Sequence, residues 1–186
     1  MRLEESDKKE LLRVARSSIE SSLSKKDMRF RTESPFLLKP QGAFVTLRID
    51  QELRGCIGYV EAHLPLIDTV AEAAVKAALQ DPRFPPLTSG ELSSVQIEIS
   101  VLSPLSKVVS PDTIQVGIHG LVIDDGFTRG LLLPGVAVEY HWTREEFLDH
   151  TAVKAGLAPD AWRSGRAKIF SFTTETFSES SVPQLH

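Results

Sequence analysis

The strongest constraint on the fold is an alternation of side chains at residues 95–102. The apolar positions are Val95, Ile97, Ile99 and Val101, and the residues between them are polar. Because successive side chains of a β-strand point to opposite faces, this pattern predicts a strand with one face in a core and one polar face. A sheet of such strands needs helices or a second sheet on its apolar side.

Three segments are predicted to be helices. Residues 67–78 carry apolar side chains three and four positions apart until Asp81-Pro82 ends the pattern, and residues 11–23 show the same spacing. A third helix is predicted to begin at a capping box formed by Thr143 and Glu146 and to end at Gly156. Each helix has an apolar side that can cover a sheet.

The order of the elements predicts the fold class. Further strands are predicted at residues 43–49, 53–60, 114–118, 121–123, 131–133 and 168–172. Strands, helices and a strand thus follow one another twice, which indicates two related strand-helix-strand halves. Short turns favour mostly antiparallel sheet flanked by helices, an α+β fold. The predicted divisions are an N-terminal helix and long loop (1–41), a core (42–177) of two halves (42–104 and 105–177), and an unpacked tail (178–186).

Composition excludes several classes of function. With 21 basic and 25 acidic residues the net charge is −4, so nucleic-acid binding is disfavoured. No dinucleotide-binding or Walker loop and no metal-ligand motif occurs, and we expect no cofactor and no metal. One cysteine cannot form an internal disulfide, and no apolar run could span a membrane, so we expect a cytoplasmic protein.

The run Leu53-Arg54-Gly55-Cys56-Ile57-Gly58 is the first candidate site. Strand alternation predicts Arg54 and Cys56 on one face, where a fixed cation would favour the thiolate. Gly55 and Gly58 would allow a ligand or another backbone segment to approach closely. The alternative is a buried structural cysteine beside an arginine that forms an ion pair.

Two further segments could contribute to the same site. Prolines stiffen the loop that carries Asp81, Arg83 and Phe84, so this loop could present a fixed charge pair, although Asp81 could equally cap backbone amides. His119 lies in a turn beside a glycine and is the histidine best suited to proton transfer, with a structural hydrogen bond as its alternative. If one site exists, Arg54 and Cys56 should lie close to Asp81, Arg83 or His119.

Taken together, these motifs resemble the AMMECR-one domain family. The resemblance covers residues 10–177 and includes the Leu53–Gly58 run, Asp81-Pro82-Arg83-Phe84, residues 95–103, His119-Gly120-Leu121, residues 131–134 and Lys154-Ala155-Gly156-Leu157. It implies two related α+β halves with a cleft between them near the Leu53–Gly58 strand. It also implies similarity to the A component of a system with a Memo-like protein and a radical S-adenosylmethionine protein.

Two hypotheses of function follow. In the first, an enzyme or small-ligand site, Cys56 is the reactive group, Arg54 and Arg83 bind an anionic substrate, and His119 and Asp81 move protons. In the second, the same residues form a non-catalytic interaction module for Memo-like and radical S-adenosylmethionine partners. The resemblance also admits an RNA-related or regulatory role.

Overall fold

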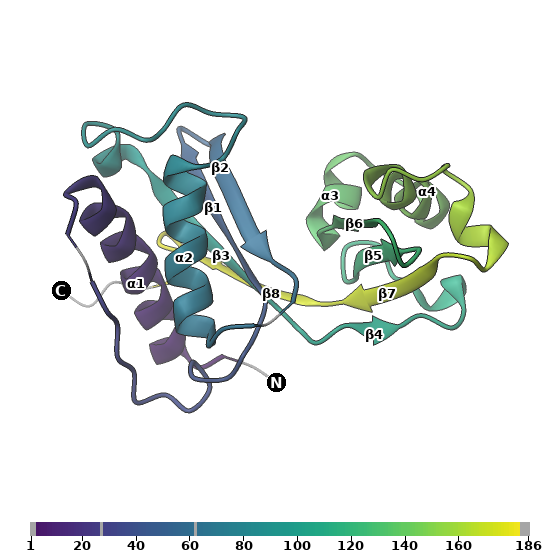
Figure 1. Cartoon of the computed structure of the whole chain (residues 1–186), viewed down its shortest axis with the longest axis horizontal. Helices are drawn as coiled ribbons and strands as arrows, with labels where there is room; N and C mark the ends of the chain where they lie inside the picture. The colour runs from purple at the N-terminus through teal and green to yellow at the C-terminus, as the bar shows by residue number, and fades with distance from the viewer. Residues whose placement is uncertain (1–2, 27, 62, 183–186) are drawn as a thin grey trace. The chain divides into compact units, whose positions relative to one another are not determined.

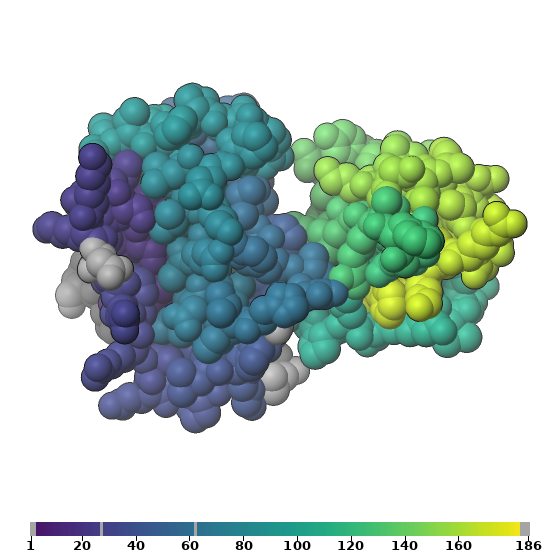
Figure 2. All heavy atoms as spheres, viewed as in Figure 1, coloured from purple at the N-terminus to yellow at the C-terminus, as the bar shows by residue number. Residues whose placement is uncertain are grey.

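The computed structural model describes residues 3–26, 28–61 and 63–182. The chain divides into two compact units, and each is described by itself (Figure 1). The first unit is Met1–Leu102 together with Glu175–His186, and the second is Ser103–Thr174. In Figure 2 the first unit's residues up to 102 are coloured purple, blue and teal, and the second unit runs from teal through green to yellow.

The first unit is built on a four-stranded sheet in the order β2-β1-β3-β8. Its strands are β1 (Ala43–Ile49), β2 (Glu52–Tyr59), β3 (Gln96–Leu102) and β8 (Thr174–Ser178). Strand β1 pairs antiparallel with both β2 and β3. Strand β2 is therefore an edge strand, and the described part of the chain places no strand on one side of its backbone.

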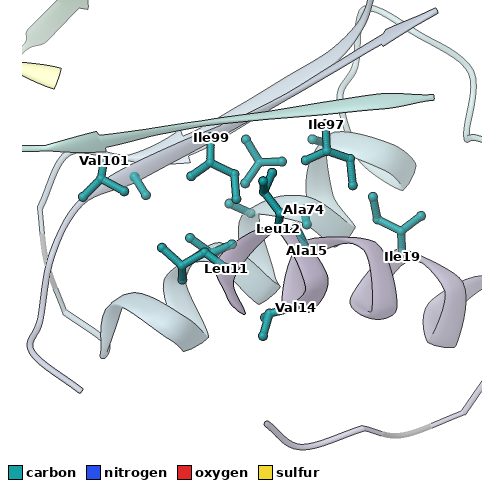
Figure 3. Packing of buried hydrophobic residues seen from close by; sticks show 14 of the residues in the cluster. Leu11, Leu12, Val14, Ala15, Ile19, Ala74, Ile97, Ile99 and Val101 are labelled. Atoms are coloured by element: carbon teal, nitrogen blue, oxygen red, sulfur yellow. The ribbon is translucent and has the colours of Figure 1, made fainter. Parts of the chain in front are cut away.

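Helices α1 (Glu5–Leu23) and α2 (Leu66–Leu79) lie side by side on one face of this sheet (Figure 1). Figure 3 shows Leu11 and Ile19 of α1 and Ala74 of α2 lying beneath the inward residues of β3. Ile97 and Ile99 of that strand are completely buried, which confirms the predicted alternation. The other face of the sheet carries its polar side chains, and no described helix of this unit covers it.

The second unit has a sheet in the order β4-β7-β5-β6. Its elements are β4 (Ser106–Lys107), β5 (Gly120–Asp124), β6 (Arg129–Leu132), α3 (Pro134–Glu139), α4 (Arg144–Lys154) and β7 (Lys168–Phe172). Short 3-10 helices lie at Leu92–Ser94 in the first unit and at Pro111–Thr113 and Ala161–Ser164 in the second. Antiparallel ladders flanked by helices confirm the α+β class. No helix in the described part of the chain is long and apolar enough to cross a bilayer.

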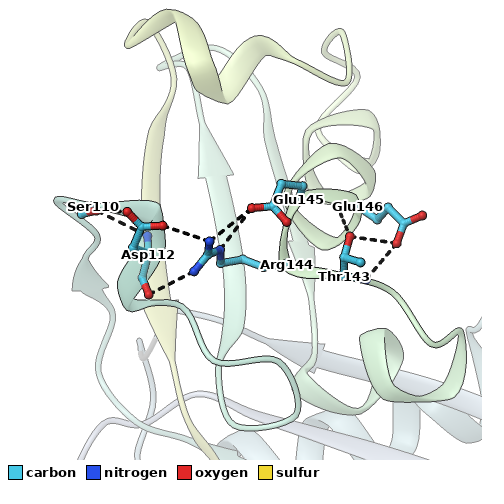
Figure 4. A network of polar contacts seen from close by, with 6 residues as sticks. All are labelled: Ser110, Asp112, Thr143, Arg144, Glu145 and Glu146. Carbon is cyan, nitrogen blue, oxygen red and sulfur yellow. Dashed lines mark hydrogen bonds and ion pairs between the residues drawn. The ribbon is translucent and has the colours of Figure 1, made fainter.

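The predicted start of helix α4 is confirmed (Figure 4). The Thr143 backbone N–H donates to Glu146 Oε2 at 2.8 Å, and the Glu146 N–H donates to Thr143 Oγ1 at 3.3 Å. Next to this capping box, the Arg144 guanidinium pairs with Asp112 at 2.9 Å. These contacts fix the first turn of α4 above a core that includes the fully buried Phe147.

Two predictions from the sequence are wrong. Residues 114–118 form no strand, because Gly117 adopts a φ of +84° and the chain turns there. Residues 178–182 are not an unpacked tail, because Glu179 accepts a hydrogen bond from Arg16 of α1 and Val182 is only 6% exposed. The rest of that predicted tail, residues 183–186, lies outside the described residues.

Arg16 joins three separate segments of the first unit. Its Nε donates to Glu179 Oε1 at 3.0 Å, Nη1 to the Leu92 carbonyl at 2.8 Å, and Nη2 to the Val95 carbonyl at 2.7 Å. Glu179 also accepts from the Ile97 N–H at 3.0 Å. One guanidinium thus connects α1 to the entry of β3 and to the segment after β8.

We expect Arg16→Ala to lower the free energy of unfolding of the first unit by about 2 kcal/mol or more, because it leaves two carbonyls without their donor and the largely buried Glu179 without its counter-charge. Arg13→Ala removes an exposed arginine from the same helix and should change it by no more than about 0.5 kcal/mol. Urea unfolding followed by far-ultraviolet circular dichroism measures both variants. Equal losses would contradict the joining role of Arg16.

Candidate functional site

The Leu53–Gly58 run lies in β2, where a side-chain pair takes the place of a neighbouring strand. The Cys56 N–H donates to Asp81 Oδ2 at 2.9 Å, and the Cys56 carbonyl accepts from Arg83 Nη2 at 3.2 Å. Arg83 and Asp81 also bind each other, at 2.7 Å and 3.0 Å. Both backbone groups of Cys56 are therefore held by one ion pair, as a partner strand would hold them.

The two members of this pair differ in exposure. The side chain of Asp81 is 2% exposed, whereas that of Arg83 is 54% exposed. Hydrogen bonds from Arg83, and then from the backbone N–H of Cys56, hold the pKa of Asp81 well below its ordinary range despite its burial. The same pairing raises the pKa of Arg83, and the charge of Cys56 makes a smaller contribution to this increase. Asp81 is thus a buried carboxylate and a weak base.

The thiol of Cys56 lies on the polar face of the sheet. Its Sγ accepts a hydrogen bond from Thr46 Oγ1 at 3.4 Å, and the residue is half-buried. Thr46 lies directly opposite Cys56 in β1 and, on its other side, opposite Glu98 in β3. Sequence analysis missed Thr46 and Glu98, although the polar positions of residues 95–102 marked the face on which Glu98 lies.

Arg54 does not follow the simple alternation of faces that the sequence predicted, because β2 contains a β-bulge at this residue. Leu47 pairs with Gly55 and Arg48 with Leu53, so Arg54 is the extra residue of the bulge. Its Nε donates to Glu91 at 2.9 Å and its Nη1 to the Pro85 carbonyl at 2.9 Å. With help from Thr88, this pairing lowers the pKa of Glu91 to about 2. The described contacts of Arg54 therefore hold the loop after α2 and do not involve the thiol.

The two glycines of the run are explained by packing. A Cβ on Gly55 would collide with the backbone carbonyl of Ala77 in α2, and one on Gly58 with the ring of Phe44 and a β1 carbonyl. Glycine at position 55 lets α2 approach the sheet closely. Their assignment to ligand binding stays a prediction.

The remaining predicted residues lie in two places. Phe84 packs beside Arg83, with the guanidinium carbon 5.5 Å from its ring centroid. His119 belongs to the second unit, where its Nδ1 accepts from the Gln115 N–H at 3.1 Å. The structure thus brings Cys56 together with Asp81 and Arg83, while the role of His119 stays a prediction. Among the described residues, no group of three His, Cys, Asp or Glu side chains could hold a metal ion.

We expect Asp81→Asn to destabilise the first unit by about 2 kcal/mol at neutral pH, because the amide has no charge and only one acceptor oxygen, so that its NH2 group would face donors of either Cys56 or Arg83. The folded pKa is lowered, so the contribution of Asp81 is complete above its unfolded pKa of about 3.9 and is lost as pH falls below it. The gap between wild type and variant should therefore narrow below about pH 4.

Urea unfolding at several pH values, followed by circular dichroism, measures this gap. Both tryptophans, Trp142 and Trp162, lie in the second unit, so their fluorescence would report on the wrong part of the chain. Asp50→Asn, in the exposed turn between β1 and β2, is the matched control and should be nearly neutral at every pH. A pH-independent gap for Asp81→Asn would contradict the assignment.

Comparison with known proteins adds the family. The AMMECR1 family model matches residues 12–177. Protein MJ0810 of Methanocaldococcus jannaschii is 45% identical over 176 residues, which cover 90% of this chain and 88% of that protein. A Methanothermobacter thermautotrophicus protein is 43% identical over 177 residues, covering 91% and 92%. The crystal structure of the uncharacterized protein PH0010 from Pyrococcus horikoshii matches with a TM-score of 0.86 and 39% identity, over 92% of this chain and 91% of that one. The chain therefore belongs to the AMMECR1 family.

Proposed function

We propose that the polar face of the first sheet is a small-molecule site in which Cys56 is the reactive nucleophile. The observation that carries this proposal is the fixed position of Cys56: Asp81 and Arg83 hold its N–H and carbonyl, and Thr46 binds its sulfur. A nucleophile held in one geometry reacts faster with a bound ligand, because less orientational freedom is lost on the way to the transition state.

Asp81 is a positioning residue in this proposal. Its carboxylate is already engaged by Cys56 and Arg83 and is too weak a base to take up a proton near neutral pH. Arg83 keeps Nη1 free of described bonds, so one edge of its guanidinium stays available for a ligand. Arg54 belongs to the scaffold, because its described bonds go to Glu91 and Pro85.

Thr46 holds the sulfur in place. Its Oγ1 donates a hydrogen bond to Cys56 Sγ, which limits the rotation of the thiol. Thr46 is itself 8% exposed, so its hydroxyl is held in place. These features support thiol chemistry on a ligand that lies against the sheet.

We expect the native protein to react with the neutral reagent methyl methanethiosulfonate, and Cys56→Ser to abolish this reaction, since the chain has one cysteine. Cys56→Ser should cost less than about 1 kcal/mol of stability because Thr46 supplies a partner for the new hydroxyl. Thr46→Val should slow the reaction about threefold or more, because the sulfur loses the hydrogen bond that orients it, whereas Thr32→Val, which removes a hydroxyl bound to Glu10, should not. A native thiol as inert as a core cysteine would end the proposal.

An interaction module with a Memo-like or radical S-adenosylmethionine protein as partner is the second candidate. The observation in its favour is the exposed Arg83 stacked on Phe84, since arginine and aromatic residues are enriched among the strongest contacts of protein interfaces. The proposed thiol chemistry needs neither partner protein, so experiments can distinguish the thiol site from the interaction module.

For the interaction module we expect Phe84→Ala to weaken binding of a purified Memo-like or radical S-adenosylmethionine protein at least tenfold, because truncating an aromatic anchor at an interface costs about 2 kcal/mol. The rate of thiol modification should not change. Titration calorimetry measures the binding, with Phe36→Ala as a control on another part of the unit. The absence of binding by wild type would exclude these partners.

A further inference from the structure

Glu98 is a carboxylate without a partner in the middle of the first sheet. It lies in β3, which is an inner strand, and it is half-buried. Among the described residues it forms no hydrogen bond and no ion pair, whereas the other acidic residues near Cys56, Asp81 and Glu91, are both paired. Because Glu98 is half-buried, water can solvate it in part, and a cationic group of a ligand could take the place of that water as its partner.

Glu98, Thr46 and Cys56 form one row across three strands. Their pairing register places all three side chains on the polar face, with Thr46 in the centre. Because neighbouring strands are about 4.8 Å apart, the backbones of Glu98 and Cys56 are about 10 Å apart, a span that one small molecule can bridge. Thr46 uses its single donor on the sulfur. The row therefore offers a ligand mainly hydrogen-bond acceptors.

The cations around this row are paired with other carboxylates. Arg54 pairs with Glu91, and Arg83 with Asp81, although Nη1 of Arg83 has no described bond and stays available to an acceptor on the ligand. Arg48 shares the polar face with Glu98, but its described bond goes to the Gln51 carbonyl in the turn between β1 and β2. The charge of Glu98 is thus the one left uncompensated beside the thiol by the described contacts.

We propose that the ligand of the Cys56 face carries a donor-rich cationic nitrogen group, an ammonium or a guanidinium, that binds Glu98. The inference rests on the proposed thiol site and adds to it the chemical class of the ligand. A cationic group satisfies the carboxylate, its N–H donors match the acceptors of Glu98 and Thr46, and it sets the rest of the molecule over the sulfur of Cys56.

Three methanethiosulfonate reagents of different charge test the inference: the aminoethyl form is cationic, the sulfonatoethyl form anionic and the methyl form neutral. In each case the Cys56 thiolate attacks the sulfenyl sulfur, a disulfide forms, methanesulfinate leaves, and the thiol proton passes to the buffer. The ratio of the cationic to the anionic rate reports the charge beside the thiol. The neutral rate reports the access to the thiol and its intrinsic reactivity, which affect all three reagents alike.

We expect wild type to prefer the cationic reagent and Glu98→Gln to lower the cationic-to-anionic ratio at least fivefold, with less than a twofold change in the neutral rate. A unit charge about 10 Å away at low ionic strength has an effect of this order. Glu20→Gln, which removes the same charge from an exposed position on α1, should leave the ratio within a factor of two. Glu98→Thr gives a second variant of good strand propensity, and circular dichroism verifies that both variants fold.

An unchanged ratio in folded Glu98→Gln and Glu98→Thr would overturn the cationic ligand while leaving the thiol site in place. A fall of equal size in Glu20→Gln would also overturn it, because net charge alone would then explain the preference. Failure of the neutral reagent to modify native wild type would overturn the thiol site itself, and the ligand inference with it.

Discussion

The ion pair between Asp81 and Arg83 is the interaction on which the first unit's candidate site depends. The strand that carries Cys56 is an edge strand, and an edge exposes backbone N–H and C=O groups that need partners. A carboxylate and a guanidinium supply one acceptor and one donor to the same residue, so the pair seals the edge where a strand would otherwise dock. It also fixes the loop after α2 to the sheet.

The charged residues near Cys56 have different roles. Asp81 and Glu91 form ion pairs with Arg83 and Arg54, which hold the loop, so both carboxylates have a structural role. The chemistry proposed for the unit rests instead on groups that face across the sheet, Cys56, Thr46 and Glu98, which belong to three strands. A rigid sheet is a good support for such groups, because its hydrogen-bonded ladders restrict the motion of each side chain's backbone.

Much of the fold could be predicted because local patterns of side chains indicate individual helices and strands. The alternation at residues 95–102, the apolar spacing of α2 and the capping box of α4 each correspond to an observed element. The prediction of a strand at 114–118 was wrong because a short apolar run is typical of strands, whereas here the chain turns at Gly117. Strand β8 was not predicted, because only one of its residues, Phe177, is apolar, and the segment from residue 178 was expected to be an unpacked tail, although the contact of Glu179 with Arg16 holds it.

The sequence by itself determined the α+β class, the inward faces of the helices and strands, and the segments that carry Cys56, Asp81 and Arg83, because each of these depends on neighbours within a few positions of the chain. Only the tertiary structure decided what those residues do. The bulge that turns Arg54 to Glu91, the pairing of Asp81 with the backbone of Cys56, and the placing of Glu98 beside Thr46 all depend on strand register and loop path. These contacts join residues 25 or more positions apart, and no local pattern encodes them.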